Sequence, residues 1–525
     1  MAADLDDAAS ALGAADAVVK GAACSVAALG GVDPNQVVAY DLAHAAAATS
    51  TARAVLDYGQ KGETEARIAC AFVADAVWDL MAKVIGRERG WGTQPDALAP
   101  TADFVARYRD PAFLAGLAGE EGPRHLDSDF ELVRDTFRRF AEERIRPVAE
   151  HVHRSNGDIP EDIISGLAEM GGFGLSVPEE YGGFASGGES DYLGMVIATE
   201  ELSRGSLGVG GSLITRPEIL TRALVKGGTE DQKQYWLPRI ATGELQVAVA
   251  VTEPDFGSDV AGLKVAASNR AGGWHITGVK TWCTFAARAD ILMLLARTDP
   301  DRSKAHRGLS LFVVPKPRAD GHGFLLSQPA GGKLEGRPID TIGYRGMHSY
   351  ELAFDGWVVP EDNLIGGERG LGQGFYYQME GFENGRLQTV ARALGLMQAA
   401  YEAATEYAAN RVVFGRPVAD YQLTKAKLGR MAILIQASRQ SMYAVARLMA
   451  KGEGAMEASM LKAYVCRAAE WVTREAMQIH GGMGYAEEFP VSRYFVDARV
   501  LSIFEGADET LALKVVARRL VDQAS

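Results

Sequence analysis

Val251-Thr-Glu-Pro-Asp-Phe-Gly-Ser-Asp-Val-Ala-Gly262 is the stretch around which the rest of this chain is arranged. A short valine-rich run at residues 246–251 leads into it and predicts a strand. Pro254, Gly257 and Gly262 then interrupt regular structure and let the backbone pass close to a flat or anionic group. The stretch is therefore either a polar turn or one wall of a ligand site.

Small hydroxyls and an indole accompany this loop. Thr252 and Ser258 lie on the loop itself. Residues 278–284 predict a further strand, which carries Trp282 and Thr284. Taken locally, Trp282 is a core indole at a strand end, and the loop beside it is an ordinary turn. The rest of the chain decides between this interpretation and a ligand site.

Helical and β-rich regions alternate along the chain. Apolar residues three and four apart at 41–58 and 63–85 predict a helical hairpin near the N-terminus. Short β-rich segments follow residue 246, and long helical periods return after Pro360. The expected fold is mainly α with a central antiparallel β-barrel or sandwich. Its expected parts are a helical N-terminal extension at 1–96, a linker at 97–124, an N-terminal helical domain at 125–245, a middle β-domain at 246–358 and a C-terminal helical bundle at 359–525.

Composition excludes several classes of protein. The 525 residues carry a formal net charge of -14, which argues against nucleic-acid binding because such a surface must neutralise phosphates. The four cysteines form no Cys-x-x-Cys pair, so neither a disulfide framework nor a metal site is expected. The acidic N-terminus does not resemble a signal peptide. No apolar run looks long enough to span a bilayer, and a cytoplasmic location is expected.

Several separate motifs, met in this order, resemble the acyl-CoA dehydrogenase family over roughly residues 125–520. They are Val251-Thr-Glu-Pro254, Gly257-Ser-Asp-Val-Ala-Gly262, Thr281-Trp-Cys-Thr284, Arg411 to Phe414 with Gln422, Gln478-Ile-His-Gly-Gly-Met-Gly-Tyr485, and Phe504-Glu-Gly506. Each motif alone is weak, and together they are specific. The resemblance implies a helical domain, a β-domain and a four-helix bundle, here behind an additional N-terminal extension.

The resemblance also implies a bound FAD. An aromatic side chain and hydroxyls suit a flat redox-active ring, and glycines let backbone amides approach phosphate oxygens. On its own, the 481–484 segment would equally fit a turn between helices. The positions that match family contacts to FAD are Val251, Thr252, Gly257, Ser258, Trp282 and Thr284 near the ring, Arg411, Phe414 and Gln422 toward a neighbouring subunit, and Gln478, Gly481 and Gly482 near the pyrophosphate and adenosine.

Glu505 matches the family's catalytic base, which removes the α-proton of a thioester. Some family members carry this base just before a matched arginine on an earlier helix. That position is Gly385 here, which cannot serve. In isolation, Glu505 would be an ordinary glutamate at a helix start.

Substrate contacts are implied for a further set of residues. Ser258, Glu383 and Arg386 match positions near the thioester and the CoA chain. The segment 203–217 looks shorter than in straight-chain members, which predicts a short, branched acyl group. Arg204 or Arg216 in this segment would bind a distal carboxylate, since an unpaired buried carboxylate is very costly. The alternatives that involve no ligand are a charge at a helix C-terminus for Arg204 and a surface residue for Arg216.

The expected activity is the FAD-dependent α,β-dehydrogenation of a short, branched, dicarboxylic acyl-CoA. Electron-transfer flavoprotein would take the electrons, and a homodimer or a dimer of dimers is implied. A different short-chain, branched or glutaryl-type dehydrogenase, or an oxidase, is the nearest alternative. A non-catalytic relative that binds nucleic acid or a partner protein is the alternative from another class. The extension is expected to pack on the C-terminal bundle.

Overall fold

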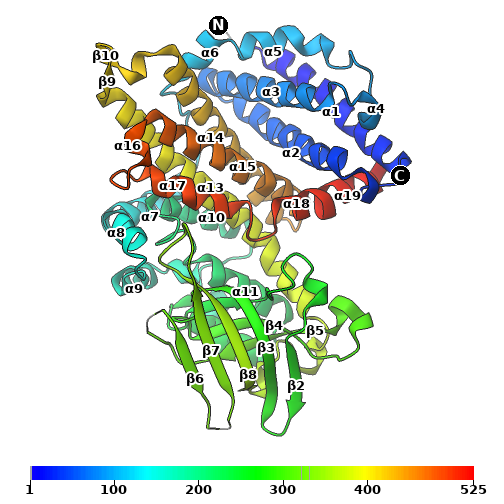
Figure 1. Ribbon diagram of the computed structural model, residues 1–525, viewed down its shortest axis with the longest axis vertical. Coiled ribbons are helices and arrows are strands. Elements are labelled where there is room, and N and C mark those ends of the chain that lie inside the picture. The colour runs from blue at the N-terminus through cyan, green and yellow to red at the C-terminus, as the bar shows by residue number, and fades with distance from the viewer. Residues whose placement is uncertain (1–2, 321, 330, 525) are drawn as a thin grey trace. The chain divides into compact units, whose positions relative to one another are not determined.

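The computed structural model describes residues 3–320, 322–329 and 331–524. The chain forms two compact units (Figure 1). One unit consists of residues 1–136 with 389–525, and the other of residues 137–388. The fold is mainly helical with a central sheet, which confirms the expected class. The domain boundaries drawn from the sequence stay predictions.

The first unit begins with three long helices: α1 Leu5–Ala28, α2 Gln36–Gly59 and α3 Glu63–Val84. They are rich in alanine, so their axes approach closely. At Gly59 an added Cβ would lie only 2.9 Å from the Ala69 Cβ. The stretch expected to be a linker forms short helices instead and buries Phe104 and Tyr108 in the core. These helices are α5 Ala102–Tyr108 and α6 Pro111–Ala115, and another short helix, α4 Glu88–Trp91, precedes this stretch.

The C-terminal helices pack against this extension, as expected. Ile433, Met456, Ala512 and Val516 share one core with residues of the first three helices. The helices concerned are α13 Gly374–Asn410, of which 389–410 belongs here, α14 Gln422–Met449, α15 Ala455–Ile479, α16 Gly482–Tyr485, α17 Val491–Leu501, α18 Asp508–Thr510, a π-helix Leu511–Ala517 and α19 Arg518–Ala524. A small hairpin of β9 Val412–Val413 and β10 Arg416–Pro417 follows α13.

Helix α1 bears on the expectation that no segment spans a membrane. By length and composition alone it could cross a membrane, because many of its residues are alanine. Asp6, Asp7, Asp16 and Lys20 interrupt its apolar runs, which is why none stood out. It is the one such helix among the described residues, and it packs on α2, α3 and α19.

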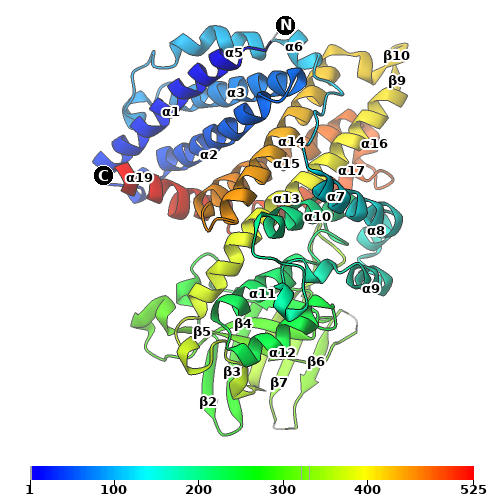
Figure 2. The same cartoon turned by 180° about the vertical axis from the view of Figure 1, so that it is seen from behind.

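The second unit places helices on a sheet (Figure 2). Its helices are α7 Ser128–Phe140, which starts in the first unit, α8 Arg146–Ser155, α9 Glu161–Glu169, α10 Glu189–Gly205, α11 Thr215–Gly227 and α12 Glu230–Ala241. Helices α11 and α12 cover one face of the sheet. Leu224 and Leu237 on these helices share a core with Met293 and Leu311 on the strands.

The sheet is mixed, not purely antiparallel. Its order is β1-β4-β2-β3-β8-β7-β6, with β5 on β4. Strand β4 pairs in parallel with β1 and β2, which corrects the antiparallel expectation, and the other pairings in this sheet are antiparallel. A long crossover between β1 and β4 makes parallel pairing possible. The strands are β1 Val247–Ala250, β2 Ala266–Arg270, β3 Gly273–Thr284, β4 Ile291–Arg297, β5 Leu309–Pro315, β6 Phe324–Ser327, β7 Lys333–Ile339 and β8 Ser349–Val359.

Candidate active site

The 251–262 loop is fixed to strand β3 by a buried ion pair. Glu253 accepts hydrogen bonds from the backbone N–H groups of Lys264 at 2.7 Å and Val265 at 2.8 Å. It also accepts one from the Lys280 ammonium at 2.9 Å, and that ammonium donates a second bond to the Val251 carbonyl. Both charged side chains are buried. Burial lowers the pKa of Lys280 to about 8, while the Glu253 charge opposes the shift.

This pairing sets the loop beside the end of β3. The Thr281 N–H donates to the Thr252 carbonyl at 2.8 Å. The ladder between β3 and β8 is irregular between Lys280 and Cys283, and Trp282 has a φ of 57°. Because a positive φ turns a side chain away from its regular strand direction, Trp282 leaves the sheet and is 55% exposed. The core-indole interpretation of Trp282 is therefore wrong.

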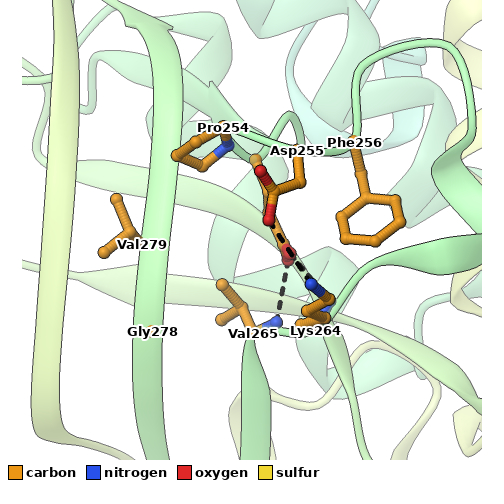
Figure 3. A pocket seen from close by; sticks show the side chains of 8 residues that line it. Pro254, Asp255, Phe256, Lys264, Val265, Gly278 and Val279 are labelled. Carbon is orange, nitrogen blue, oxygen red and sulfur yellow. Dashed lines mark hydrogen bonds and ion pairs between the residues drawn. The ribbon is translucent and has the colours of Figure 1, made fainter.

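Thr284 completes this group. Its hydroxyl lies 2.9 Å from the Ser349 hydroxyl on β8 and remains partly exposed. Behind the loop is a small cavity of about 230 Å³, shown in Figure 3. Its lining includes Glu253, Phe256, Lys264 and Val279. The Lys264 ammonium lies 3.4 Å from a carboxylate oxygen of Asp255. Ser258 and Gly257 lie on the exposed part of the loop.

The predicted segment 203–217 is buried and leads into α11 from the same unit. Glycines let it lie against the chain at 344–348: a Cβ on Gly208 would lie 2.1 Å from the Arg345 carbonyl oxygen. The Phe285 N–H in turn donates to the carbonyls of Met347 and His348. The structure thereby places the 203–217 segment next to the residues that support Thr284.

The two candidate arginines differ in what surrounds their charge. Arg204 is 1% exposed and pairs with Glu201 at 3.1 Å and with Glu142. Arg216 is 8% exposed, and its guanidinium donates to the Ser212 carbonyl at 2.9 Å and to the Tyr344 hydroxyl at 2.9 Å.

A third contact of Arg216 is with the Met347 sulfur at 3.7 Å. Within the described ranges, no carboxylate forms an ion pair with this arginine. Burying a charge without a counter-ion is very costly, which makes Arg216 a candidate to bind an anionic group. Arg204 does lie in the last turn of α10, as its alternative predicted, although it is buried. The surface alternative for Arg216 is wrong, because this side chain is buried.

In the first unit, Glu505 lies on a strained loop between α17 and α18. Its φ is 55°, a left-handed conformation that costs a non-glycine residue roughly 1–3 kcal/mol and that is characteristic of functional sites. One carboxylate oxygen accepts a bond from Arg392 at 3.2 Å, and the other is buried without a partner among the described residues. The Lys462 ammonium donates to the carbonyls of Phe504 and Gly506, at 2.9 and 2.6 Å.

The remaining predicted FAD contacts of this unit are exposed. Phe414 is 98% exposed with a φ of 48° at the tip of the β9–β10 hairpin, and Arg411 and Gln422 lie beside it in sequence. Gln478 lies in the last turn of α15, Gly481 follows that helix and Gly482 begins α16, and nothing lies within 4 Å of a Cβ built on either glycine. The rings of Tyr407 and His480 stack with their centroids 4.2 Å apart. This contact joins α13, which leads into the hairpin, to the C-terminal end of α15.

The residues present fit the expected FAD. A half-exposed indole and partly exposed hydroxyls in the second unit suit a flat ring that needs hydrogen bonds at its edge. The open backbone at Gly481 and Gly482 suits phosphate oxygens. On α13, Glu383 is half-buried and Arg386 is 9% exposed, so the latter is not a solvated charge.

Sequence reasoning missed Arg392, Lys462 and the Glu253–Lys280 pair. These contacts join residues far apart in the chain, so no local pattern announces them. It also missed a cluster of Asp158, His322 and His348, whose ligand-type atoms lie within 4.8 Å of one another. His348 lies 3.0 Å from Asp158, and the bond from His348 holds the pKa of that carboxyl below its usual value. We interpret this cluster as an ion pair.

The comparisons with known proteins agree with one another. Models of the N-terminal, middle and C-terminal domains of acyl-CoA dehydrogenase match residues 127–244, 248–357 and 372–521. The (2S)-methylsuccinyl-CoA dehydrogenase of Cereibacter sphaeroides is 44% identical over 426 residues, which cover 81% of this chain and 74% of that protein.

Solved structures give the same result. A chain from a study of the electron transferring flavoprotein of Acidaminococcus fermentans aligns with a TM-score of 0.68 and 30% identity, over 75% of this chain and 98% of its own. A glutaryl-coenzyme A dehydrogenase in complex with glutaryl-CoA aligns with a TM-score of 0.68 and 28% identity, over 75% and 95%.

Proposed function

Because this chain belongs to the acyl-CoA dehydrogenase family, whose members are FAD-dependent oxidoreductases, we propose that it oxidises (2S)-methylsuccinyl-CoA to mesaconyl-CoA. Buried Arg216, with only neutral partners among the described residues, is the observation that carries the choice of a dicarboxylic substrate. The similarity to a methylsuccinyl-CoA dehydrogenase supports the branched acyl group. This oxidation is a step of the ethylmalonyl-CoA pathway, in which we place the enzyme.

Each group has a role in this proposal. When bound, FAD accepts the hydride that leaves the β-carbon of the thioester. The Glu505 carboxylate takes the α-proton, and the Glu505 N–H donates to the thioester oxygen, where negative charge develops. Arg216 binds the distal carboxylate. Trp282 would cover the flavin ring, and the Thr284 hydroxyl would bond its edge.

The remaining contacts to ligands and partners are part of the same proposal. Val251, Thr252, Gly257 and Ser258 would line the ring and the thioester. Glu383 and Arg386 would contact the CoA chain. Electrons would pass to an electron-transfer flavoprotein, which the similarity to a chain from the Acidaminococcus study supports. Exposed Phe414 would reach the FAD of a second copy in a dimer or a dimer of dimers, in the cytoplasm.

A glutaryl-type substrate is the second candidate. The same unneutralised Arg216 favours any thioester with a distal carboxylate, and the likeness to a glutaryl-coenzyme A dehydrogenase supports it. The two candidates differ in branching, and the small glycine-packed 203–217 segment favours the shorter, branched chain.

Anaerobic reduction of the flavin tests this proposal. (2S)-Methylsuccinyl-CoA should bleach the bound flavin faster than glutaryl-CoA, succinyl-CoA or butyryl-CoA. Glu505→Gln should retain oxidised flavin that no thioester bleaches, because the amide cannot accept the α-proton. Fastest bleaching by butyryl-CoA would contradict the dicarboxylic substrate. Bleaching of the Glu505→Gln protein at the original rate would place the base elsewhere.

A further inference from the structure

One face of α2, in the N-terminal extension, points at the segment that carries Glu505. Tyr40 and His44 are four residues apart, so they share this face, and their rings lie 4.6 Å apart in an edge-on arrangement. The Tyr40 hydroxyl donates to one carboxylate oxygen of Asp508 at 2.5 Å, and the Nε2 atom of His44 lies 3.2 Å from the same oxygen. His44 is 4% and Asp508 8% exposed, so these contacts are shielded from water.

Asp508 is the end of the Glu505 loop. Its backbone N–H donates to the Ser502 carbonyl at 3.0 Å, which closes the backbone on either side of Glu505. Lys462 on α15 holds the middle of the loop through the two flanking carbonyls. The loop is therefore anchored twice, by α15 at its middle and by α2 at its end. Both ribbon views show α2 beside the C-terminal helices (Figures 1 and 2).

The contacts from α2 to Asp508 are strong enough to affect the Glu505 loop. Hydrogen bonds to an ionised group are roughly twice as strong as bonds between neutral groups. Burial alone would raise the pKa of Asp508, but the bonds from His44 and Tyr40 outweigh burial and hold that pKa below its usual value. The carboxylate is thus ionised and held, while the left-handed backbone at Glu505 needs its surroundings to maintain it.

We propose that Tyr40 and His44 are positioning residues, which act through Asp508 to hold the Glu505 carboxylate at the substrate α-carbon. This inference rests on the proposed role of Glu505 as base. It gives the N-terminal extension a function in the reaction beyond packing on the bundle. A shift of about 1 Å in a reacting group costs up to roughly 100-fold in rate, so a loosened loop should be measurable.

Tyr40→Phe is the central test, with Tyr58→Phe as its matched control. Tyr58 lies on the same helix and is buried, whereas Tyr40 is half-buried, and the Tyr58 hydroxyl bonds the Pro123 carbonyl and Gln436. The readouts are FAD content, melting temperature and anaerobic flavin reduction at saturating (2S)-methylsuccinyl-CoA, or the fastest thioester of the panel. We expect Tyr40→Phe to slow reduction at least about tenfold, with unchanged half-saturation and a larger isotope effect for α-deuterated substrate.

Two further variants keep the result decisive if Tyr40→Phe folds poorly. His44→Gln retains an N–H donor and should reduce the flavin faster than His44→Ala does, whereas Asp508→Asn should resemble Tyr40→Phe. Equal rates for Tyr40→Phe and Tyr58→Phe, or His44→Gln no better than His44→Ala, would overturn the inference. If Glu505→Gln still bleaches, the base assignment fails first. If it does not bleach and the Tyr40 and Tyr58 variants agree, only the positioning role fails.

Discussion

At the scale of single residues, Arg216 is the side chain to which the proposed reaction assigns the choice between a dicarboxylic and a neutral substrate. Its three contacts are a backbone carbonyl, a phenol and a thioether, none of which carries charge. Arg204, twelve residues earlier, is already neutralised by Glu201 and Glu142. The first therefore has a charge to offer a ligand, and the second has a structural partner.

Replacing these arginines separates their roles. Arg216→Gln should lower kcat/KM for (2S)-methylsuccinyl-CoA by about 200–5000-fold, because a buried pair that loses one partner costs about 3–5 kcal/mol. A neutral branched thioester such as isobutyryl-CoA should lose less than about tenfold. Arg204→Gln, the control, should lower the melting temperature and leave the ratio between the two thioesters unchanged. Equal losses on both thioesters for Arg216→Gln would remove its assigned role.

At the scale of elements, the loop that opens the β-domain depends on a strand two elements later. Glu253 and Lys280 form a buried ion pair that also binds backbone groups of the loop. Trp282 is therefore positioned by an interaction between two residues that lie 27 positions apart in the chain. The motif predicted that something binds here. It did not show that its own glutamate is structural, because nothing local distinguishes a ligand contact from a buried ion pair.

A double-mutant cycle tests this pair. Glu253→Gln leaves the Lys280 ammonium buried without its partner, and we expect it to cost about 3–5 kcal/mol of unfolding free energy and to weaken FAD retention. Adding Lys280→Met should restore part of that loss, because the unpaired charge is gone. Urea unfolding of each purified holoprotein gives the four values. Strictly additive effects would mean that the two side chains do not interact.

Lys316 at the end of β5 makes stability depend on pH. Burial lowers its pKa to about 8, and its ammonium donates to the carbonyls of Ala287, Ala289 and Pro317. Between about pH 8 and its usual pKa near 10.4, the unfolded chain binds a proton that the folded chain has released. The contribution of Lys316 to stability therefore rises with pH across this window and is lost as pH falls through 8.

The comparison of wild type with Lys316→Met measures that contribution. As pH rises from 8 to 10, the unfolding free energy of the wild type should increase relative to that of Lys316→Met by roughly 1.4 kcal/mol per pH unit. Melting temperatures of the two proteins at pH 7.5, 8.5 and 9.5 are enough to see it. A difference that stays constant across these values would show that Lys316 does not titrate there.

At the scale of the whole molecule, the sequence predicted the order of helical and β regions, and the family, because these depend on local periodicity and on motifs. It predicted the candidates Trp282, Thr284 and Glu505 for the same reason. It did not predict the parallel pairing of β4, the bounds of helix α1, which precedes the predicted hairpin, or the Tyr40–Asp508 contact. Each of these depends on segments that meet only after the chain has folded.

Assembly is the prediction that belongs to this scale. Phe414 is almost fully exposed on a hairpin whose Val412 is also 56% exposed, and the proposed dimer would cover this apolar surface. Phe414→Ser should shift the protein from dimer toward monomer and lower its FAD content. Leu132→Ser is the control, since Leu132 is 67% exposed on α7 and should change neither quantity. Sedimentation velocity with flavin absorbance reads both, and an unchanged dimer in the Phe414 variant would contradict the assignment.

The glycine-packed turn at 206–212 has a consequence for how this enzyme can evolve. A Cβ atom on Gly208 would lie 2.1 Å from a backbone carbonyl oxygen, and Cβ atoms on Gly210 and Gly211 would lie 2.5 and 2.4 Å from the side chains of Ile145 and Ser203, so a larger residue in this turn forces its neighbours to move. New acyl specificities are therefore harder to reach through this turn than through the facing segment, where Tyr344 and Met347 contact Arg216. A directed-evolution library would do best to randomise those two positions and leave the glycines untouched.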